Sequence, residues 1–487
     1  MKTPLMSALC ALMLGAGPLP VSATPAPAAP SSAQSAVQSA DAIAAELAAK
    51  ALASDLPMQI VTDLTTEIGP RLAGTEAEKR AADWAEARLK ALGFENVRQE
   101  SFPITGWLRG EEKAEITGPA PQPLVVTALG ASVATPPEGL EAEVVIFKRY
   151  ADLLAAPEGA LTGKIALVTE KTVRMQDGSG YGAAGKVRRS GASEAARRGA
   201  VAYLLRSLGT HEHRFPHTGA QVYAEGAPQI PAAALSPPDV EQIERLAARG
   251  HTVKVRLTLT PTHPGVVTSQ NVIAEVKGRE KPDEIILIGA HLDSWDQGTG
   301  AIDDGTGVAM VTAAAKLIRD LPQRPKRTIR VVLFGAEEYG LLGAKAYAEA
   351  HKSEMHKHIL ATEADFGQGP VYAFHTRVAD PNHPTLARIQ NALTPLGIYR
   401  GHNRAHGGPD IGPLMQLGVP VVNLALEGSD YFDTHHTPDD TLDRIERKRL
   451  NQATAAYAAF TYLAAELDGD YRANAIASGE SAAPAGN

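Results

Sequence analysis

The pattern of apolar and polar positions is most regular in the last two fifths of the chain. After residue 264, continuous apolar runs of strand length alternate with helical patterns; the runs lie at 271–276, 285–289, 329–334, 358–362 and 419–424. Continuous apolar strands separated by helices are typical of a largely parallel sheet with helices on both faces. We therefore predict an α/β fold over residues 265–468, with a mostly parallel mixed sheet between layers of helices.

Helical patterns also flank this region. Residues 41–94 show helical periodicity, and Thr75 and Glu78 have the spacing of a capping box. Four residues then recur at helical spacing: Ala81, Trp84, Arg88 and Leu92. A second stripe, expected to pack on the sheet, consists of Ala453, Ala456, Phe460, Leu463 and Leu467. We assign residues 41–120 to the N-terminal part of the same domain.

Residues 121–264 have a different pattern of apolar and polar positions. Short apolar runs at 142–147, 164–169 and 201–205 alternate with turns rich in Gly and Pro, and helix-like stretches occur at 193–198 and 239–249. This pattern predicts an inserted, mainly β module with a few helices. Its three histidines, His211, His213 and His217, have no carboxylate at ligand spacing, and we interpret them as part of a polar loop.

The two ends of the chain are expected to lie outside the fold. Residues 1–23 combine Lys2, an apolar stretch and the small residues Val21-Ser22-Ala23, the features of a signal peptide for export to the periplasm or the medium. Residues 24–40 read as an Ala-, Pro- and Ser-rich linker, and residues 469–487 as a disordered tail. The single cysteine, Cys10, lies in the leader, so the mature protein is expected to have neither disulfides nor thiolate ligands.

Composition excludes some partners. The 487 residues carry a formal net charge of −8 without a basic block, which argues against nucleic-acid binding. No stretch reaches the roughly 20 apolar residues of a membrane span, so no membrane anchor is expected.

Candidate chemistry lies where the apolar strands end. Four strands run directly into His, Asp or Glu, and the residues are His291 with Asp293, Glu337 with Glu338, Asp365, and His435 with His436. A glycine-rich loop, residues 300–307, adds Asp303. In an open α/β sheet, ligands bind outside the carboxyl ends of the strands. Alone, each of these residues could be a turn former, a helix cap or a charge that complements a helix dipole. Their joint occurrence indicates a metal site.

The residue types suit a pair of divalent ions. Two ions about 3.5–4 Å apart need one bridging carboxylate and further His or carboxylate ligands for each. Nitrogen and oxygen donors favour two zinc ions, with cobalt or manganese as substitutes. A carboxylate beside the attacking water could act as general base, and adjacent Glu337 and Glu338 can divide the roles of ligand and base. Asp293 could orient the imidazole of His291.

At these residues the chain resembles the zinc aminopeptidase family of di-zinc exopeptidases, and within it the carboxypeptidase Q (plasma glutamate carboxypeptidase) branch. The matching segments are HLDSWD (291–296), GAIDDGTG (300–307), FGAEEYGLLG (334–343), TEADFG (362–367) and HHTPDDT (435–441). The resemblance implies the zinc exopeptidase fold and a cis peptide after the bridging aspartate. The 121–264 insert is similar to a protease-associated domain.

The resemblance also implies roles for individual residues. His291 and Asp365 would bind one zinc, Glu338 and His436 the other, and Asp303 would bridge them. His435 is the alternative to His436, and Glu337 matches the general base. From position alone, Asp410 and Tyr431 are candidate substrate contacts.

The implied activity is hydrolysis of short peptides from a free end, by an aminopeptidase or a carboxypeptidase Q-like dipeptidase, in a possible homodimer. Two alternatives use related scaffolds. One is an inactive receptor or binding protein, which the presence of all five ligand positions and Glu337 disfavours. The other is a glutaminyl cyclase-like acyltransferase with a single zinc, which the insert disfavours.

Overall fold

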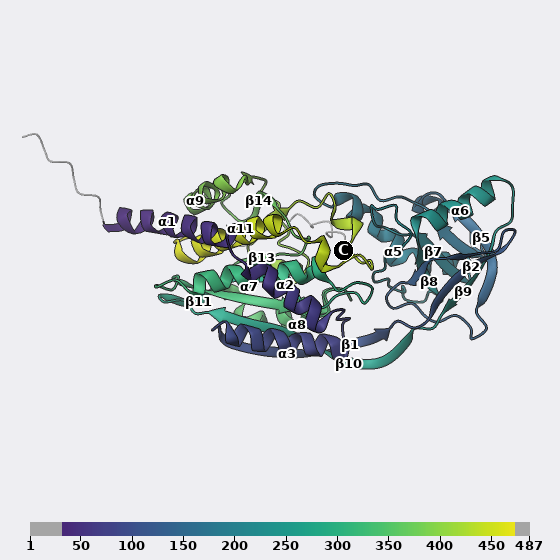
Figure 1. Cartoon of the computed structure of the whole chain (residues 1–487), viewed down its shortest axis with the longest axis horizontal. Helices are drawn as coiled ribbons and strands as arrows, with labels where there is room; N and C mark the ends of the chain where they lie inside the picture. Colours follow the sequence, from purple (N-terminus) through teal and green to yellow (C-terminus); the bar gives the residue numbers. More distant parts are fainter. Residues whose placement is uncertain (1–31, 473–487) are drawn as a thin grey trace, which may run out of the picture. The chain divides into compact units, whose positions relative to one another are not determined.

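The computed structural model describes the backbone of residues 32–472 and the side chains of residues 40–472 (Figure 1). The expected signal peptide, residues 1–23, lies outside the described residues. The chain divides into two units, residues 1–39 and residues 40–487, and the architecture described below is that of the second. Among the described residues, no helix combines the length and the apolar composition needed to cross a bilayer.

The larger part of the fold is built on an eight-stranded mixed sheet. Its strands, in order across the sheet, are β1 (Glu95–Leu108), β10 (Thr262–Val276), β12 (Arg327–Phe334), β11 (Lys281–His291), β13 (His358–Glu363), β16 (Val421–Leu426), β14 (Val371–Arg377) and β15 (Tyr399–Arg400). The four central strands, β12, β11, β13 and β16, run parallel to one another, and β1, β10 and β14 pair antiparallel. The predicted α/β fold with a mixed sheet between helices is therefore confirmed.

Both faces of this sheet are buried. Successive side chains of a strand point to opposite faces, so one strand contributes to two apolar clusters. Ile286 and Ile288 of β11 pack into one apolar cluster, while Ile285 and Leu287 pack into another. The helices of the first cluster are α1 (Ser32–Leu52), α2 (Leu56–Asp63), α3 (Glu76–Ala91), α7 (Thr306–Arg319), α9 (Pro384–Leu393) and α11 (Arg447–Glu466). The opposite face is covered by α8 (Leu342–Ala350) and α10 (Gly412–Gln416).

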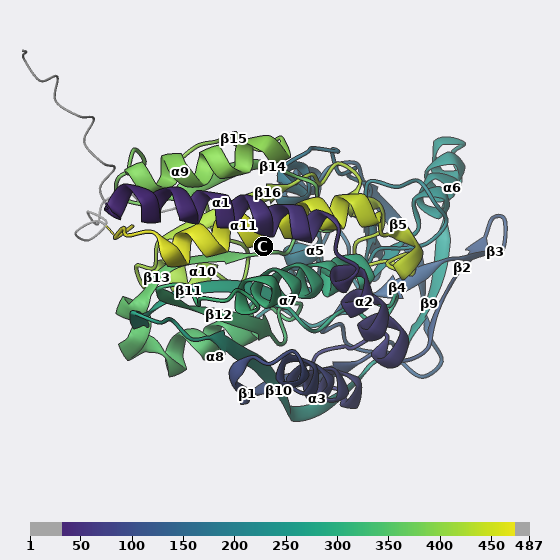
Figure 2. The same ribbon diagram turned by 60° about the vertical axis from the view of Figure 1, so that its left-hand side comes forward.

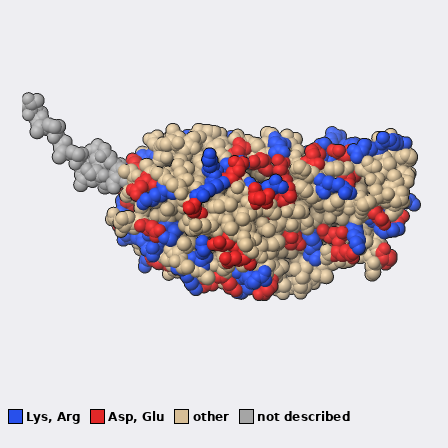
Figure 3. Space-filling model, viewed as in Figure 1, with Lys and Arg blue, Asp and Glu red and all other residues tan. Residues whose placement is uncertain are grey.

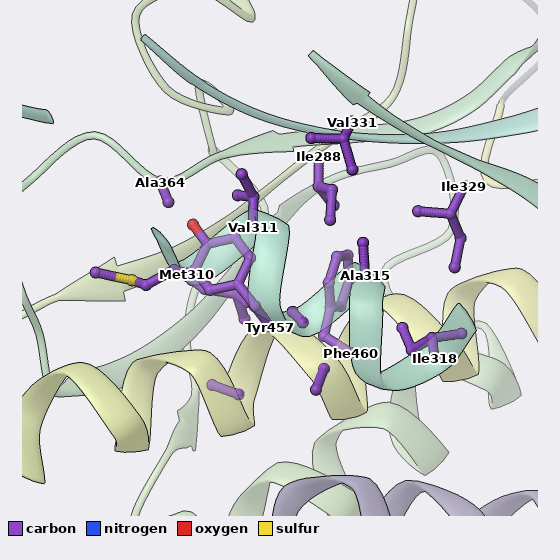
Figure 4. Close-up of a cluster of buried hydrophobic side chains, with 14 of the residues drawn as sticks. Ile288, Met310, Val311, Ala315, Ile318, Ile329, Val331, Ala364, Tyr457 and Phe460 are labelled. Atoms are coloured by element: carbon purple, nitrogen blue, oxygen red, sulfur yellow. The ribbon is translucent and has the colours of Figure 1, made fainter. Parts of the chain in front are cut away.

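The centre of the first cluster lies between the sheet, α7 and α11. Figure 4 shows Val311 and Ala315 of α7 beside Ile288 of β11 and the aromatic rings of Tyr457 and Phe460 of α11. Figure 2 shows α11 lying alongside α1 and α7. This packing fixes α7, the helix that follows the loop bearing Asp303, against the strand that ends at His291.

A second eight-stranded sheet is built from residues 112–259, and we call this part the second lobe (Figure 1). Its strands, in order across the sheet, are β3 (Gln122–Leu124), β2 (Glu112–Gly118), β9 (Lys254–Leu259), β5 (Leu140–Phe147), β6 (Ile165–Val168), β7 (Ala202–Arg206), β8 (Ala232–Leu235) and β4 (Val126–Ala128). Its helices are α4 (Tyr150–Ala155), α5 (Ser179–Arg197) and α6 (Pro237–Ala248).

Two sequence expectations differ from the structure at the edges of these elements. The insert begins earlier than residue 121, because β2 pairs with β9 rather than with the first sheet. Helix α5 starts at Ser179 instead of residue 193; glycines at 180, 182, 185 and 191 weaken its helical signal. Gly191 is needed there, because a Cβ atom at this position would lie 2.2 Å from the ring of Tyr203.

The expected linker and tail are shorter than the sequence suggested. Helix α1 already begins at Ser32, within the range 24–40 that we expected to be linker. At the other end, Tyr471 is buried and its carbonyl accepts a hydrogen bond from the N–H of Ala379, so the chain stays ordered past residue 469.

Glu78 makes only half of the expected capping box. The Thr75 hydroxyl accepts a hydrogen bond from the N–H of Glu78 at 3.3 Å, as predicted. The Glu78 carboxylate instead accepts from the N–H of Gly74 at 2.6 Å and from the Ser269 hydroxyl at 2.5 Å, and it is buried. It therefore ties α3 to β10.

Charged side chains are mixed on the molecular surface. On the face in Figure 3, acidic and basic residues are interspersed without a continuous basic patch. The expected absence of a nucleic-acid partner stays a prediction.

Candidate metal centre

The candidate metal ligands meet at one edge of the first sheet. Strands β12, β11, β13 and β16 are parallel neighbours, so their carboxyl ends lie side by side. His291 ends β11, Glu338 and Asp365 follow β12 and β13, and His436 lies in the loop after β16. Asp303 comes from the turn Ala301–Gly305 that leads into α7.

These five residues form two groups that share one carboxylate. In the first group, His291 Nε2 lies 3.0 Å from Asp303 Oδ1 and 3.7 Å from Asp365 Oδ1. In the second group, His436 Nε2 lies 3.2 Å from Asp303 Oδ2 and 2.9 Å from Glu338 Oε2. The donor atoms of each group lie within 4.8 Å of one another, a spacing that suits a metal ion. Each oxygen of Asp303 thus faces a different group. The Asp303–Asp304 peptide bond is cis, as the resemblance implies.

Main-chain carbonyls orient the imidazoles of both groups. Nδ1 of His291 lies 3.0 Å from the carbonyl oxygen of Asp293, and Nδ1 of His436 lies 3.3 Å from the carbonyl oxygen of Thr218. Nδ1 of His436 also lies 3.3 Å from Nη1 of Arg188. A carbonyl oxygen only accepts, so Nδ1 of His291 donates to it, and its Nε2 can offer a lone pair to a metal ion when one is bound. A hydrogen bond of this kind is usual at the second nitrogen of a metal-binding histidine.

Asp293 has a different main contact from the one expected. Its carboxylate lies 3.6 Å from His291 Nδ1, whereas its main-chain carbonyl oxygen lies 3.0 Å from the same nitrogen. The carboxylate oxygens accept hydrogen bonds from the N–H groups of Glu337 at 3.0 Å and Glu338 at 3.3 Å. Asp293 therefore fixes the turn that carries both glutamates as well as contacting the imidazole of His291.

Burial makes this arrangement costly without a cation. His291, Asp303, Glu338 and His436 are all buried, and Asp303 Oδ2 and Glu338 Oε1 have no hydrogen-bond partner among the described residues. Burial raises the pKa of Glu338 to about 6; it would lower that of His436, but Glu338 and Asp303 raise it to about 9. Buried carboxylates need a paired charge or a metal. The donor set therefore fits divalent metal ions.

Glu337 lies beside the two groups and keeps partial access to solvent. A carboxylate oxygen of Glu337 lies within 4.8 Å of donor atoms of His291 and Glu338. Burial raises the pKa of Glu337 well above its ordinary value, and the negative charges of Glu338, Asp365 and Asp410 add to the rise, against the opposing effect of His291. A carboxyl group with a raised pKa next to a metal site is suited to taking up a proton.

His435 is the alternative ligand left open by the sequence, and its surroundings differ from those of His436. Its Nε2 lies 3.3 Å from Asp303 Oδ2, and its Nδ1 lies 3.1 Å from Nε2 of His217 instead of a carbonyl oxygen. The rings of His435 and His436 stack with centroids 3.6 Å apart. Only His436 joins both Asp303 and Glu338 in a candidate ligand group, so the geometry favours His436.

The interpretation of His217 as part of a polar loop is wrong. Its side chain is 1% exposed and lies against His435 and His436, with which it forms a third group of possible ligands. A separation of 218 residues from His435 left no spacing pattern to find it. The one available signal was the presence of three histidines in a single loop of the second lobe.

Two further residues that the sequence did not single out hold the loops of the site. The Asp440 carboxylate accepts hydrogen bonds from the N–H groups of Ile302 at 2.5 Å and Asp303 at 3.3 Å. The fully buried guanidinium of Arg71 donates to the carbonyls of Leu292, Thr299 at 2.7 Å and Gly300 at 2.8 Å. Arg71 therefore links the segment after His291 to the loop that carries Asp303.

Replacing Arg71 by Met should destabilise the protein by about 3 kcal/mol or more, because several buried carbonyls lose their donors at once. Urea unfolding of metal-free protein measures this change independently of the metal site. Arg80 on α3 is exposed, and Arg80→Met is the matched control. A destabilisation by Arg71→Met no larger than that of the control would show that Arg71 does not hold these loops.

The two candidate substrate contacts lie in different environments. Tyr431 lines a cavity of about 190 Å³ together with Ile302 and Phe366, the neighbours in sequence of Asp303 and Asp365. Asp410 is fully buried, its N–H donates to Glu363 at 2.7 Å, and both its carboxylate oxygens lack a hydrogen-bond partner among the described residues. Tyr431 is thus placed at a cavity next to the sequence neighbours of two metal ligands, whereas Asp410 is buried against Glu363.

Known proteins are similar to this chain over the segments that form the site. The sequence profile of peptidase family M28 matches residues 271–461. Carboxypeptidase Q of Bos taurus is 36% identical over 405 residues, covering 83% of this chain and 84% of the bovine one. The crystal structure of a peptidase M28 precursor from Shewanella amazonensis is 52% identical, with a TM-score of 0.87, covering 90% of this chain and 99% of that one. A zinc aminopeptidase of Bacillus subtilis shares the fold, with a TM-score of 0.62 at 22% identity, covering 86% of this chain and 98% of that one.

Proposed function

This chain belongs to peptidase family M28 and is a metallo-exopeptidase, and from that premise we propose that it hydrolyses dipeptides and other short peptides from a free end. The observation that carries the proposal is the Asp303 carboxylate, which offers one oxygen to His291 and the other to His436. Such a carboxylate can bridge two metal ions. Relatives named carboxypeptidase Q and aminopeptidase support cleavage at a peptide end.

In this proposal the site holds two zinc ions, with cobalt or manganese as substitutes. His291 and Asp365 would bind one ion, Glu338 and His436 the other, and Asp303 would bridge them. When bound, the ions lower the pKa of a water molecule and polarise the scissile carbonyl group.

Glu337 acts as the general base in this proposal. It takes a proton from the attacking water and passes it to the nitrogen of the leaving amine, which then departs as a neutral amine. The turn that carries Glu337 is held by the hydrogen bond from its N–H to Asp293, so the carboxylate stays beside the site between proton transfers. Partial solvent access at Glu337 and Asp365 supports entry of the peptide on this side.

Three further proposals concern the rest of the chain. The second lobe is a protease-associated domain, which its separate eight-stranded sheet and the resemblance support. The protein is exported, which the leader at residues 1–23 supports. It forms a homodimer, as the resemblance implies. Sequencing of the N-terminus of secreted protein and light scattering would test the last two.

The activity can be tested with a panel of dipeptides and longer peptides whose termini are free, N-acetylated or C-amidated. We expect rapid cleavage of dipeptides with both ends free, loss of activity on treatment with a chelator, and recovery when zinc is restored. Equal rates on N-acetylated substrates would exclude the aminopeptidase and dipeptidase functions. A purified protein that held no metal and gained no activity with zinc would exclude the whole mechanism.

A further inference from the structure

A segment of the second lobe that forms neither helix nor strand lies against the metal centre. It comprises residues 171–178, between β6 and α5, and we call it the strap. A Cβ atom at Gly178, the last residue of the strap, would lie 2.6 Å from the ring of Phe366, the residue after the candidate ligand Asp365. No side chain fits between the strap and this ring, so the strap packs directly beside a metal ligand.

Arg174 holds the strap to the loop at residues 427–433, which leads from β16 toward His436. Its guanidinium makes a bidentate contact with the Asp433 carboxylate, with 2.9 Å between Nη1 and Oδ2 and 2.6 Å between Nη2 and Oδ1. The same group donates a hydrogen bond to the carbonyl oxygen of Ser429. Two parallel hydrogen bonds between charged groups are stronger than neutral ones and fix the geometry of the pair.

Gln176 makes a second attachment to the same loop. Its side-chain amide donates to Glu427 Oε2 at 2.7 Å, and its main-chain carbonyl accepts from the N–H of Gly428 at 3.0 Å. We call the contacts of Arg174 and Gln176 the latch, and both of these residues are exposed. The loop that the latch holds also carries Tyr431, which lines the cavity described above. The strap is thus joined to one wall of this cavity by a few contacts at the surface.

The second lobe covers the metal centre beyond the strap as well. The ring of Tyr181 stacks on Phe432 with centroids 4.2 Å apart, and the N–H of Thr218 donates to the carbonyl of His436 at 3.0 Å. Glu337, by contrast, keeps partial access to solvent. The metal centre is therefore covered where the second lobe meets it and open at the proposed general base.

We propose that the strap is a wall that limits the length of the substrate and is held by the latch, so that the protein prefers dipeptides to longer peptides. This proposal rests on the proposed peptidase function. A dipeptide needs only the space between the metal ions and the strap. A longer peptide must displace the strap, and the free energy of breaking the latch is then added to its barrier. Because the strap has no helix or strand hydrogen bonds, the latch contributes much of that cost.

The test compares dialanine with tetraalanine, which differ in length but not in side chains. In the double variant Arg174→Met/Gln176→Met, the two side chains remain long but lose their hydrogen bonds to the loop. An isolated exposed ion pair contributes little, but a bidentate pair joined to further hydrogen bonds contributes more. We therefore expect kcat/KM for tetraalanine to rise about 10-fold and that for dialanine to change by less than about twofold.

Hydrogen exchange of the strap amides provides a readout without substrate. Breaking the latch should speed exchange in residues 171–178, because opening of this segment then costs less free energy. Arg197→Met is the matched control. Arg197 is the last residue of α5 and pairs with Glu194, and its side chain is 44% exposed, the same as that of Arg174. The control should change neither the exchange of the strap nor the ratio of the two kcat/KM values.

Four outcomes would overturn the proposal. One is a wild-type protein that cleaves tetraalanine as fast as dialanine. Another is faster exchange of the strap with an unchanged ratio of the two rates, which would show that the strap is not a wall. An equal fall for both substrates would mean that the latch holds the loop before His436 rather than limiting length. Unchanged exchange would show that Arg174 and Gln176 do not hold the strap.

Failure of the proposed function would look different. A wild-type protein that cleaved neither peptide would refute the peptidase function, and with it the strap as a limit on substrate length, before any variant is made. The exchange measurement would still show whether the latch holds the strap. Cleavage of dialanine by the wild type, with one of the four outcomes above, would instead leave the peptidase function standing and refute only the role of the strap.

Discussion

Replacing Glu337 by Gln should leave the metal content unchanged and lower kcat about 100- to 10,000-fold, the range that general base catalysis contributes. Gln keeps the size of the side chain and the backbone hydrogen bond to Asp293, but an amide cannot take a proton from water. Burial and the neighbouring carboxylates raise the pKa of Glu337, a direction that favours proton uptake. Metal analysis of the purified variant and steady-state kinetics on one dipeptide measure both quantities.

A matched control separates this effect from a general effect of removing a charge. Glu349 on α8 is exposed, with a side chain 77% accessible, and Glu349→Gln should retain full activity. Because Glu337 acts on the chemical step, KM should change far less than kcat. Retained activity in Glu337→Gln would remove Glu337 from the role of base. A loss of metal from the variant would show that Glu337 is itself a ligand.

The sequence predicted the parts of this site that a sheet brings together by rule. His291, Glu338 and Asp365 each follow an apolar run, and those runs form neighbouring parallel strands, so their ends had to meet at one edge. The fold class followed from the same pattern, because continuous apolar runs are required in strands that are buried on both faces. The position of Asp303 followed from its glycine-rich loop before a helix.

Contacts between segments far apart in the chain could not be predicted, because no sequence pattern marks them. Arg71 and His217 reach the site from a loop before α3 and from the second lobe, and nothing in their local sequence indicates a partner more than 200 residues away. The choice between His435 and His436 depended on which imidazole reaches both Asp303 and Glu338, a property of the folded chain alone. The start of α5 was predicted too late in the chain, because glycines that allow close packing weaken the helical signal.

Replacing Asp303 by Asn should have the largest effect of any single change, abolishing measurable turnover and reducing the metal content below two ions per chain. The side chain keeps its shape, but one carboxylate oxygen becomes an NH2 group. That group cannot bind a metal ion, and it faces either His291 Nε2 or His436 Nε2. One ligand group therefore loses its shared oxygen whichever way the amide is turned.

The same substitution tests the shared role of Asp303 against a role in only one group. If Asp303 serves both groups, titration with zinc should show weakened binding of both ions, because the neutral amide also binds its remaining ion less strongly than a carboxylate. Asp443 is an exposed aspartate seven residues after His436, and Asp443→Asn should bind two ions with wild-type affinity. An Asp303→Asn variant with two tightly bound ions would refute the bridge. One ion bound at full strength would place Asp303 in a single group and leave the two metal sites independent.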